Sequence, residues 1–475
     1  GITKPVKDVR PYIFPRRSNR CGYILKFESI KTHKVKKLTE FVLILLLFVT
    51  LPSAGQEIND LIKKEVSASL SAAEQMYRDL HQNPELSLQE FRTAAKMALA
   101  LQSLGFEVTT GVGGNGVVGV LRNGDGPVIM LRTDMDALPV KESTGVPWAS
   151  KAVAADSQGA EIPVMHACGH DLHMTVWHGT LSTLVALKKR WRGTIVAVAQ
   201  PAEEVSGGSE KMIDDGLFKR FPLPDYALCY HVNPDLPAGT IGYCPGAIFA
   251  GVTSVDIKVF GIGGHGAMPH KTIDPVVLSA KIILDYQTIV SREINPVLPA
   301  VVTVGSIHGG TKHNIIPEEV DMKLTVRFFS DDVYRQIIAA LRRIADGQAV
   351  AAGLKEDRMP DISVASEYTP PVENDPALVT RATTSMADIL GNENVIRVEP
   401  ATVAEDFGMY GRTPEKVKIA LFWLGGVNPG IYRQSIEEGT MLPALHSSNF
   451  CPDFVPAYTT GVTAMSRTLI DLLKQ

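Results

Sequence analysis

Short apolar runs alternate with helical patterns along most of this 475-residue chain. The runs at 117–121, 128–131, 194–199 and 226–230 are continuously apolar, and residues 174–189 have the spacing of a helix. Strands that are buried on both faces lose the alternation of polar and apolar positions, and helices connect strands that run parallel. The pattern therefore predicts an α/β fold with a mostly parallel sheet flanked by helices.

Further elements are predicted at both ends of this pattern. Apolar spacing predicts helical structure over 61–104, with a break at 82–84 that divides it into two helices. Far downstream, 417–424 is another apolar run, and 457–473 has the spacing of an amphipathic closing helix. The domain that holds the sheet is therefore expected to include segments from both halves of the sequence.

The interval between these regions has a different pattern. It predicts, in order, strand 254–260, helix 275–290, strand 300–307, strand 319–329, helix 332–351 and strand 361–364. The order β-α-β-β-α-β is that of a ferredoxin-like unit. We therefore predict a discontinuous catalytic domain, 56–250 and 366–475, with a small α+β lid domain inserted at 251–365.

The first 55 residues have the composition of a leader. Basic residues precede the apolar run 41–49, and small residues follow it at 53–55. This order is typical of a secretory signal peptide. The apolar run of about a dozen residues is shorter than the roughly 20 that a membrane-spanning helix needs. We expect cleavage after Gly55 and export to the periplasm or the medium; the alternative is an uncleaved membrane anchor.

Charge and cysteine content exclude several classes of protein. The formal net charge of -4 gives no general attraction to nucleic acid or to acidic membranes. No phosphate-binding loop, nucleic-acid module or G-x-S-x-G nucleophile motif is present. Five cysteines are too few for a disulfide scaffold in so long a chain. Cys229 and Cys451 are expected to be single buried thiols, although two cysteines of an exported protein could pair.

Chemically capable side chains follow three of the predicted strands. They are Asp136 after 128–131, Glu203 and Glu204 after 194–199, and His231 after 226–230. Ligands of parallel sheets collect beyond the carboxyl ends of the strands. Three such segments at one sheet edge therefore predict a functional site.

Segment 165–173, Met-His-Ala-Cys-Gly-His-Asp-Leu-His, is the densest group of metal-binding side chains. Cys168 and His170 are separated by one glycine and can turn toward the same ion. Cysteine, histidine and carboxylate ligands suit zinc or a neighbouring transition ion. The alternative is a set of surface histidines at a helix start, with Asp171 as the cap of a helix that begins at Met174.

The adjacent carboxylates Glu203 and Glu204 suit a divided role. One can bind a metal while the other takes a proton from the attacking water; the alternative is an ordinary solvated pair. His265 in the Gly-rich segment 261–270 has two interpretations, a ligand-contacting loop or an exposed hairpin histidine. Taken alone, Asp406 could be a helix cap, and His446 a loop histidine.

In their order and spacing, these motifs resemble the M20 metallopeptidase family, most closely its amidohydrolase branch. They are RTDMDALP at 132–139, MHACGHD at 165–171, PAEE at 201–204, GGHGAMPH at 263–270, AEDF at 404–407 and HSSNF at 446–450. This branch includes hippurate hydrolases, N-acyl-amino-acid deacylases and auxin-conjugate hydrolases. The resemblance covers residues 60 to 473 approximately.

The resemblance implies two divalent metal ions per subunit: zinc, manganese, cobalt or nickel. Cys168 would bridge them, and the other implied ligands are His170, Glu204, His231 and His446. Glu203 would be the general base. The branch usually has proline where Ser448 stands, so we expect His446 to bind from a slightly different loop.

The resemblance also implies supporting residues and a partner. Asp136 would stand behind the ligands, with Asp171 in a supporting role. His265 would stabilise the oxyanion, reaching the active site of a partner subunit, and Asn314 would contact substrate. The inserted domain would form a homodimer.

We therefore predict an exported metal-dependent amidohydrolase that cleaves small N-acyl or aminoacyl amino acids with metal-activated water. The first alternative is a carboxypeptidase or dipeptidase that acts on unmodified peptides. The others are an inactive binding protein of the same fold and a closed structural zinc module. No nucleic-acid partner is expected, and no stable membrane anchor after processing.

Overall fold

The structure is a computed structural model that describes residues 54–156 and 159–474. The predicted leader, 1–55, lies outside these residues except for Ala54 and Gly55, which begin the first helix. Within the described ranges, no helix is both long enough and apolar enough to cross a membrane. All four cysteines of these ranges, Cys168, Cys229, Cys244 and Cys451, are free thiols.

The central element of the described chain is an eight-stranded sheet with the order β1-β2-β6-β3-β7-β18-β8-β17. Its strands are β1 (Glu107–Val112), β2 (Gly116–Asn123), β3 (Val128–Asp134), β6 (Gly193–Gln200), β7 (Tyr226–Pro237), β8 (Ile241–Tyr243), β17 (Val395–Arg397) and β18 (Lys418–Val427). The four central strands, β6, β3, β7 and β18, run parallel. β6, β3 and β18 are buried along most of their length, and β7 over its first half, which explains the continuously apolar runs. The predicted α/β fold is confirmed.

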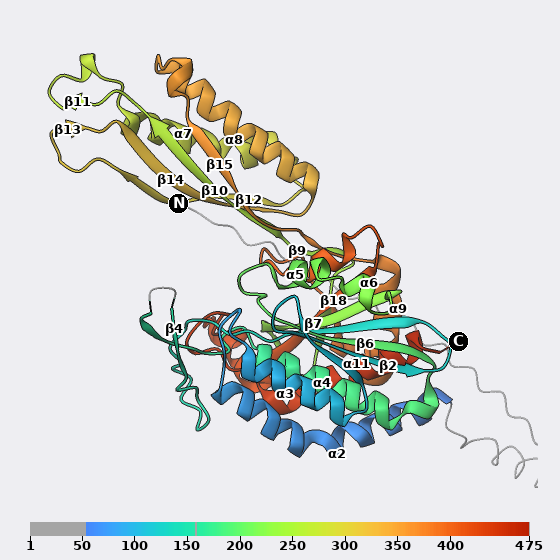
Figure 1. The fold of residues 1–475 in the computed structure, drawn as a ribbon. Helices are drawn as coiled ribbons and strands as arrows, with labels where there is room; N and C mark the ends of the chain where they lie inside the picture. The colour runs from blue at the N-terminus through green and yellow to red at the C-terminus, as the bar shows by residue number, and fades with distance from the viewer. Residues whose placement is uncertain (1–53, 157–158, 475) are drawn as a thin grey trace, which may run out of the picture. The chain divides into compact units, whose positions relative to one another are not determined.

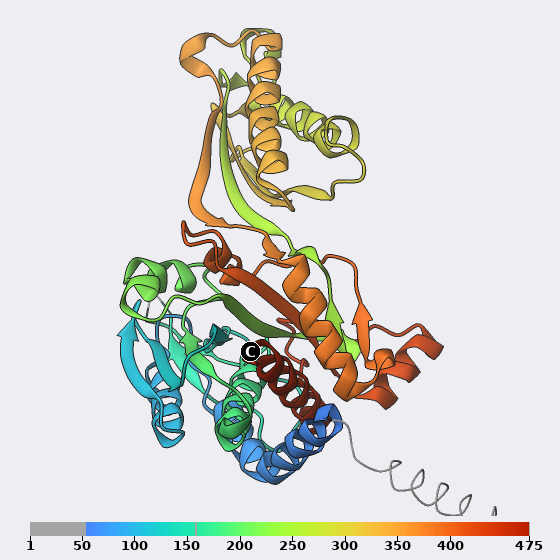
Figure 2. The ribbon, with the colours of Figure 1, turned by 90° about the vertical axis from the view of Figure 1, so that its right-hand side faces the viewer.

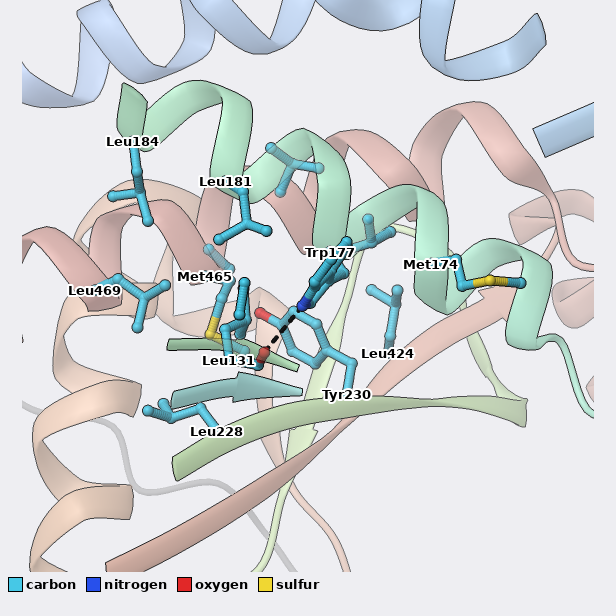
Figure 3. Close-up of a cluster of buried hydrophobic side chains, with 14 of the residues drawn as sticks. Leu131, Met174, Trp177, Leu181, Leu184, Leu228, Tyr230, Leu424, Met465 and Leu469 are labelled. Atoms are coloured by element: carbon cyan, nitrogen blue, oxygen red, sulfur yellow. Dashed lines mark hydrogen bonds between the residues drawn. The ribbon is translucent and has the colours of Figure 1, made fainter. Parts of the chain in front are cut away.

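Helices cover both faces of this sheet (Figure 1). They are α2 (Ala54–Gln82), α3 (Phe91–Ser103), α4 (His170–Ala186), α5 (Gly208–Asp214), α6 (Leu217–Arg220), α9 (Pro376–Leu390) and α11 (Phe454–Leu472). The largest apolar cluster joins α2, α3, α4, α9 and α11 to one face of the sheet. Figure 3 shows part of it, where the Trp177 indole of α4 donates to the Leu131 carbonyl of β3 at 2.9 Å.

Helix α4 begins one turn earlier than the sequence predicts. Gly169 has a φ of 78°, a left-handed conformation that glycine adopts without strain, and the helix starts directly after it at His170. The first turn therefore carries His170, Asp171 and His173, and all three are buried. The alternative of surface histidines at a helix start is wrong.

The inserted segment forms a separate antiparallel sheet with the order β12-β14-β10-β15. Its elements are β10 (Gly251–Phe260), α7 (Pro275–Thr288), β12 (Ala300–Gly309), β14 (Glu319–Phe328), α8 (Asp331–Ala351) and β15 (Asp361–Thr369). All six elements were predicted in this order, and both helices pack on one face of the sheet. Figure 2 shows β10 and β15 side by side where this sheet connects to the rest of the chain. The domain boundaries stay a prediction.

Smaller elements complete the described chain. They are β4 (Val153–Ala155), β5 (Glu161–Pro163), β9 (Gly246–Phe249), β11 (Gly264–His265), β13 (Ile315–Ile316), β16 (Val372–Asn374), α10 (Pro429–Glu438) and the 3-10 helix η6 (Asp406–Gly411). Together with α5 and α6, η6 packs on the face of the central sheet opposite α4. Both faces of the parallel strands are therefore covered, and their carboxyl ends are left to form a site.

Candidate metal centre

Four segments that are far apart in sequence meet at the carboxyl edge of the central sheet. Cys168 precedes α4, Glu204 follows β6, and His231 lies within β7. The Cys168 Sγ lies 3.4 Å from His231 Nε2. Glu204 places one carboxylate oxygen 3.7 Å from His170 Nε2 and the other 3.5 Å from His446 Nε2. The structure thus brings together all five side chains that the sequence predicts as metal ligands.

Two of these histidines present a fixed nitrogen to the group. The His231 Nδ1–H donates to the Val232 carbonyl at 2.9 Å, so Nε2 is the nitrogen with a free lone pair. His170 places Nδ1 3.4 Å from Asp136 Oδ1 and directs Nε2 toward Glu204. Hydrogen bonds or carboxylates behind a histidine fix its ring orientation in metal sites. Asp136 therefore stands behind His170, where the sequence analysis expects it.

Several buried polar atoms of this group make no hydrogen bond within the described chain, although they lie near one another. They are both ring nitrogens of His170, Glu204 Oε1 and Asp136 Oδ1. A buried polar atom without a hydrogen bond is rare in native proteins and points to an ion or a water. Thiolate, imidazole and carboxylate together suit zinc and its neighbours. The residues present therefore fit a transition-metal site.

The grouping of these side chains also fits two ions. The Cys168 Sγ lies within 4.8 Å of a ring nitrogen of both His170 and His231. It also lies within 4.8 Å of a Glu204 carboxylate oxygen and a His446 ring nitrogen. A cysteine that is shared by two such sets has the position of a bridging ligand. The solvated alternative for the carboxylate pair is wrong, because Glu203 and Glu204 are both largely buried.

Without cations, burial disfavours the ionised forms of the thiol and carboxyl groups of this site. Burial raises the pKa of the Cys168 thiol well above its ordinary value, and the nearby Glu204 and Glu203 charges raise it further. Burial also raises the pKa of Glu204 to about 7, although the charge of His170 opposes this. Divalent cations reverse this balance, because they favour the thiolate and carboxylate forms.

The loops at the site hold strained backbone. Ala202 and Ser206, on either side of the carboxylate pair, have φ angles of 54° and 52°, and His446 has 65°. A non-glycine residue in this left-handed region costs about 1–3 kcal/mol and is found mostly at functional sites. His446 is held there by its backbone N–H, which donates to the Ala167 carbonyl at 2.8 Å. Ser448, at the position where proline was expected, anchors the same loop by accepting from Ser143 N–H at 2.7 Å.

A fully buried arginine lies among carboxylates next to the group. Arg132 donates to Asp134 at 2.7 Å and to Glu405 at 2.8 Å, and its third carboxylate contact, Asp406, is at 3.2 Å. These contacts tie the ends of β3 and η6 together, and Glu405 rather than Asp406 caps η6 by accepting from Phe407 N–H. The sequence suggested Asp406 as the helix cap, but the capping residue is its neighbour Glu405.

Asp171 lies on the other side of α4, away from the predicted ligands. It accepts from His81 at 2.7 Å, and His81 also contacts Glu142 at 3.0 Å. Burial alone would lower the pKa of His81, but these two carboxylates raise it to about 10. The imidazolium of α2 is thus held between two carboxylates, which joins α2 to the metal-binding end of α4.

His265 and Asn314 are not brought to the predicted ligands in the single chain. Both side chains are exposed. His265 is in β11, and Asn314 directly precedes β13, the strand that pairs with β11. Beside this pair, the Gly266 N–H donates to the Asn314 carbonyl at 2.9 Å. The exposed-hairpin alternative describes His265 in one chain correctly. Its predicted action in a partner subunit stays a prediction.

A cavity of about 380 Å³ opens onto the group. Its lining residues are Cys168, Glu203, Glu204, Ser206, His231, Val252, Arg327, Val403, Ala404, Leu445 and His446. Arg327 comes from β14 of the inserted sheet, and its guanidinium donates to the Thr402 carbonyl at 3.2 Å. A larger hollow of about 610 Å³ lies around Asp331 and Arg412 and contains no group of potential metal ligands. The chemistry therefore belongs to the smaller cavity.

Sequence reasoning missed two residues of this site. Arg327 gave no signal, because it occupies an ordinary outward position of an alternating strand. His173 was counted in the cluster at 165–173 but received no role, although it lies one helical turn from His170. A search for i, i+3 histidine pairs at the start of the helix would have singled it out.

Comparison with known proteins places this geometry in a family. The sequence profile of Peptidase family M20/M25/M40 matches residues 130–446. N-acetylcysteine deacetylase of Bacillus subtilis is 34% identical over 74% of this chain and 87% of its own length. N-acetyldiaminopimelate deacetylase of Leuconostoc citreum is 35% identical over 78% and 93%, and thermostable carboxypeptidase 2 of Saccharolobus solfataricus is 35% identical over 80% and 90%.

Solved structures give the same result. A putative aminohydrolase from methicillin-resistant Staphylococcus aureus aligns with a TM-score of 0.76 and 28% identity, covering 88% of this chain and all (100%) of that one. A Bacillus subtilis protein described as a dinuclear metal-binding peptidase of the M20 family aligns with a TM-score of 0.70 and 29% identity, covering 86% and 99%. The fold described above is thus shared with these solved structures, one of which is described as a dinuclear metal-binding peptidase.

Proposed function

The chain belongs to peptidase family M20/M25/M40, and from this premise we propose that it deacylates small N-acyl or aminoacyl amino acids. The family membership makes it a metal-dependent hydrolase of amide or peptide bonds. We propose that the bond it cleaves is the amide bond between the acyl or aminoacyl group and the amino acid. The relatives named as deacetylases support the N-acyl substrate.

The observation that carries this proposal is a positively charged side chain, Arg327, in the cavity wall. Arg327 is the one permanently positive side chain in the described lining. Burial lowers the pKa of Arg327, and no carboxylate of the described residues offsets that burial. Arg327 is half-buried, and a partly desolvated guanidinium gains from an anionic partner and binds a carboxylate with directional hydrogen bonds. A substrate with a free carboxylate supplies that partner.

The size and walls of the cavity also suit a small substrate. A volume of about 380 Å³ is at the lower end of the range for small-molecule sites. Val252, Val403 and Leu445 give it apolar wall on which an acyl group or side chain can pack. An amino acid with a short acyl group therefore fits better than a long peptide.

The five predicted ligands, Cys168, His170, Glu204, His231 and His446, would hold two divalent cations. When bound, such cations polarise a carbonyl and lower the pKa of water, which makes it a nucleophile at neutral pH. We propose that these cations are zinc, manganese, cobalt or nickel.

Glu203 is the group placed to move protons. It lines the cavity, and its Oε2 lies 4.0 Å from His170 Nε2. As a carboxylate it accepts a proton from the attacking water, and as the acid it delivers that proton to the departing amine. Burial, together with the charges of Glu405 and Glu204, holds the pKa of Glu203 well above its usual range. Bound cations would oppose this shift and favour the carboxylate form that the first step needs.

Substrate comparison and Arg327 variants test this proposal together. The wild type should hydrolyse N-acetyl or N-benzoyl amino acids and discriminate strongly against the matching amino-acid carboxamides. Arg327→Ala should raise KM for the free acids about 10- to 100-fold, which corresponds to about 1.5–3 kcal/mol for a hydrogen bond to a charged group. Its KM for the carboxamides should change little, so the discrimination should disappear.

Matched variants complete this test. Arg327→Lys keeps the charge but loses the planar fork, so it should fall between Ala and wild type. Arg335→Ala removes an exposed arginine of α8 that does not line the cavity, and it should leave KM unchanged. Faster cleavage of unmodified dipeptides than of N-acyl amino acids would instead favour the carboxypeptidase or dipeptidase alternative, which the carboxypeptidase relative also supports.

We also propose export by the leader and a homodimer through the inserted domain. The basic and apolar residues before Ser53 support export. A mature protein that begins near Gln56 in the medium or periplasm is expected, and full-length protein retained in the cell would argue against it. Analytical ultracentrifugation should give twice the chain mass; a monomer at micromolar concentration would exclude a stable dimer.

A further inference from the structure

His173 has no part in the chemistry described so far, yet it is buried at the centre of the site. It lies one turn after His170 on α4, and both of its ring nitrogens make hydrogen bonds of normal length. The Val232 backbone N–H donates to Nε2 at 2.8 Å, and Nδ1 lies 2.7 Å from Asp134 Oδ1. The ring thus connects the end of β3 to the middle of β7.

The two contacts determine the tautomer of His173. A backbone N–H can only donate, so Nε2 must be the unprotonated nitrogen. Nδ1 then carries the hydrogen and donates it to Asp134, whose second oxygen accepts from Arg132 at 2.7 Å. Both ring nitrogens are used in hydrogen bonds, so His173 is not a metal ligand. This holds although a ring nitrogen lies within 4.8 Å of potential ligand atoms of Asp134 and His170.

The Val232 N–H needs this acceptor because the sheet no longer provides one. Strands β3 and β7 pair only from Ile129–Tyr226 to Leu131–Leu228, and beyond that point they diverge. Val232 is fully buried, so its N–H would have no partner if His173 were removed. An unsatisfied buried donor costs about 1–3 kcal/mol. His173 therefore replaces the neighbouring strand at this position.

His173 holds the N–H of Val232, and the carbonyl of the same residue, in the next peptide, orients a predicted metal ligand. Val232 directly follows His231, and its carbonyl accepts the Nδ1–H of the His231 ring. The His173 and His231 rings also contact each other, with centroids 4.8 Å apart. A shift of the Val232 peptide would therefore turn the His231 ring and move Nε2 away from Cys168.

We propose that His173 is a positioning residue that fixes the His231 ligand through the Val232 peptide and so sets the metal affinity of the site. This inference rests on the metal-dependent function proposed above. Positioning partners behind metal ligands typically contribute about 10- to 100-fold to metal affinity.

Two amide variants separate the two hydrogen bonds of His173. The side-chain oxygen in His173→Gln can reach the place of Nε2 and accept from Val232 N–H, but the link to Asp134 is lost. The side-chain NH₂ in His173→Asn can reach the place of Nδ1 and donate to Asp134, but the acceptor for Val232 is lost. His173→Gln should keep zinc affinity within a few-fold of wild type, whereas His173→Asn should lose about 10- to 100-fold.

Zinc affinity is measured by competition with a graded series of chelators, and the cobalt-loaded proteins are compared by absorption spectroscopy. In His173→Asn the cobalt bands should shift, because the His231 ligand is displaced. The control pair is His178→Gln and His178→Asn, on the same helix but outside the ligand groups. Equal affinity of the two His173 variants, or an Asn variant that binds like wild type, would overturn the inference.

Nitrogen-15 NMR of histidine-labelled, metal-free wild type provides a second test that needs no variant to fold. His173 should show a proton on Nδ1 and none on Nε2; a proton on Nε2 would refute the assignment. The two proposals fail separately. If wild type binds zinc but hydrolyses no amide, only the proposed function is contradicted. If the enzyme is active but His173→Asn leaves its zinc affinity unchanged, only the role of His173 is contradicted.

Discussion

At the scale of single residues, buried charge pairs hold the site in its fold. The imidazole of His81 lies between the carboxylates of Glu142 and Asp171, and all three side chains are almost fully buried. Hydrogen bonds from His81, Thr144 and Ser150 lower the pKa of Glu142 despite its burial, and the two carboxylates raise that of His81 to about 10. The group is therefore most stabilising when His81 is charged and both carboxylates are ionised.

This arrangement predicts how His81 contributes to stability as pH changes. The His81 contribution is complete below its ordinary pKa of 6.5 and is lost as pH rises from there to about 10. The Glu142 contribution is complete above its ordinary pKa of 4.5 and is lost as pH falls. The difference in unfolding free energy between wild type and His81→Gln should therefore be largest between pH 4.5 and 6.5.

That difference should reach about 3–5 kcal/mol, the cost of removing one partner of a buried pair. Urea denaturation across the pH range measures it, with His178→Gln as a control from the same core. A difference that grows toward pH 10 would contradict the assignment of a charged His81.

The sequence predicted the candidate ligands and Asp136 behind them, but not the roles of His173 and Arg327. Cys168, His170 and Glu204 are recognisable because thiol, imidazole and carboxylate have few other uses when they gather in short motifs. The role of His173 depends on a strand divergence that frees the Val232 N–H, and no local pattern encodes it. Arg327 reaches the cavity only because β14 ends beside it.

At the scale of elements, α8 and η6 are joined by an ion pair at the base of the inserted sheet. Arg412, directly after η6, donates to both carboxylate oxygens of Asp331 at 3.0 and 2.9 Å. The Tyr368 hydroxyl donates to the same carboxylate at 2.7 Å. Since η6 starts at Asp406, which contacts the buried Arg132, this pair connects α8 to the interior of the site.

A double-mutant cycle measures the strength of this connection. Arg412 and Asp331 are roughly one-third exposed, so solvent screens their attraction, and the coupling should be about 0.2–1 kcal/mol. Arg412→Gln, Asp331→Asn and the double variant are compared by chemical denaturation, with Tyr368→Phe as the control for the hydroxyl contact. A coupling above about 3 kcal/mol would show that the pair behaves as a buried one.

Element order was predictable where periodicity was strong. The strands β2, β3, β6, β7 and β18 and all six major elements of the inserted sheet were predicted because burial on one or two faces leaves a regular pattern. The start of α4 was placed too late because its first turn is mostly histidine and aspartate, which give no apolar period. The left-handed Gly169 explains why the helix begins there.

At the scale of the whole molecule, the order of strands brings the site together. Sheet pairing places β18, from near the end of the chain, beside β7, so that the loop with His446 closes over residues from the first half. Sequence motifs predicted that these segments share a site, but not the left-handed backbone of Ala202, Ser206 and His446. Such strain arises from tertiary contacts, which local sequence does not specify.

The central claim is that two bound metal ions and Glu203 together hydrolyse an amide. The most direct measurement titrates metal-free wild type and Glu203→Gln with zinc or manganese and records metal content and turnover of N-acetyl amino acids on the same samples. Wild type should bind two ions per chain and become active as they bind. Glu203→Gln should bind the same two ions but turn over about 100- to 10,000-fold more slowly. Near-normal turnover by the metal-loaded variant, or turnover by metal-free wild type, would contradict the account.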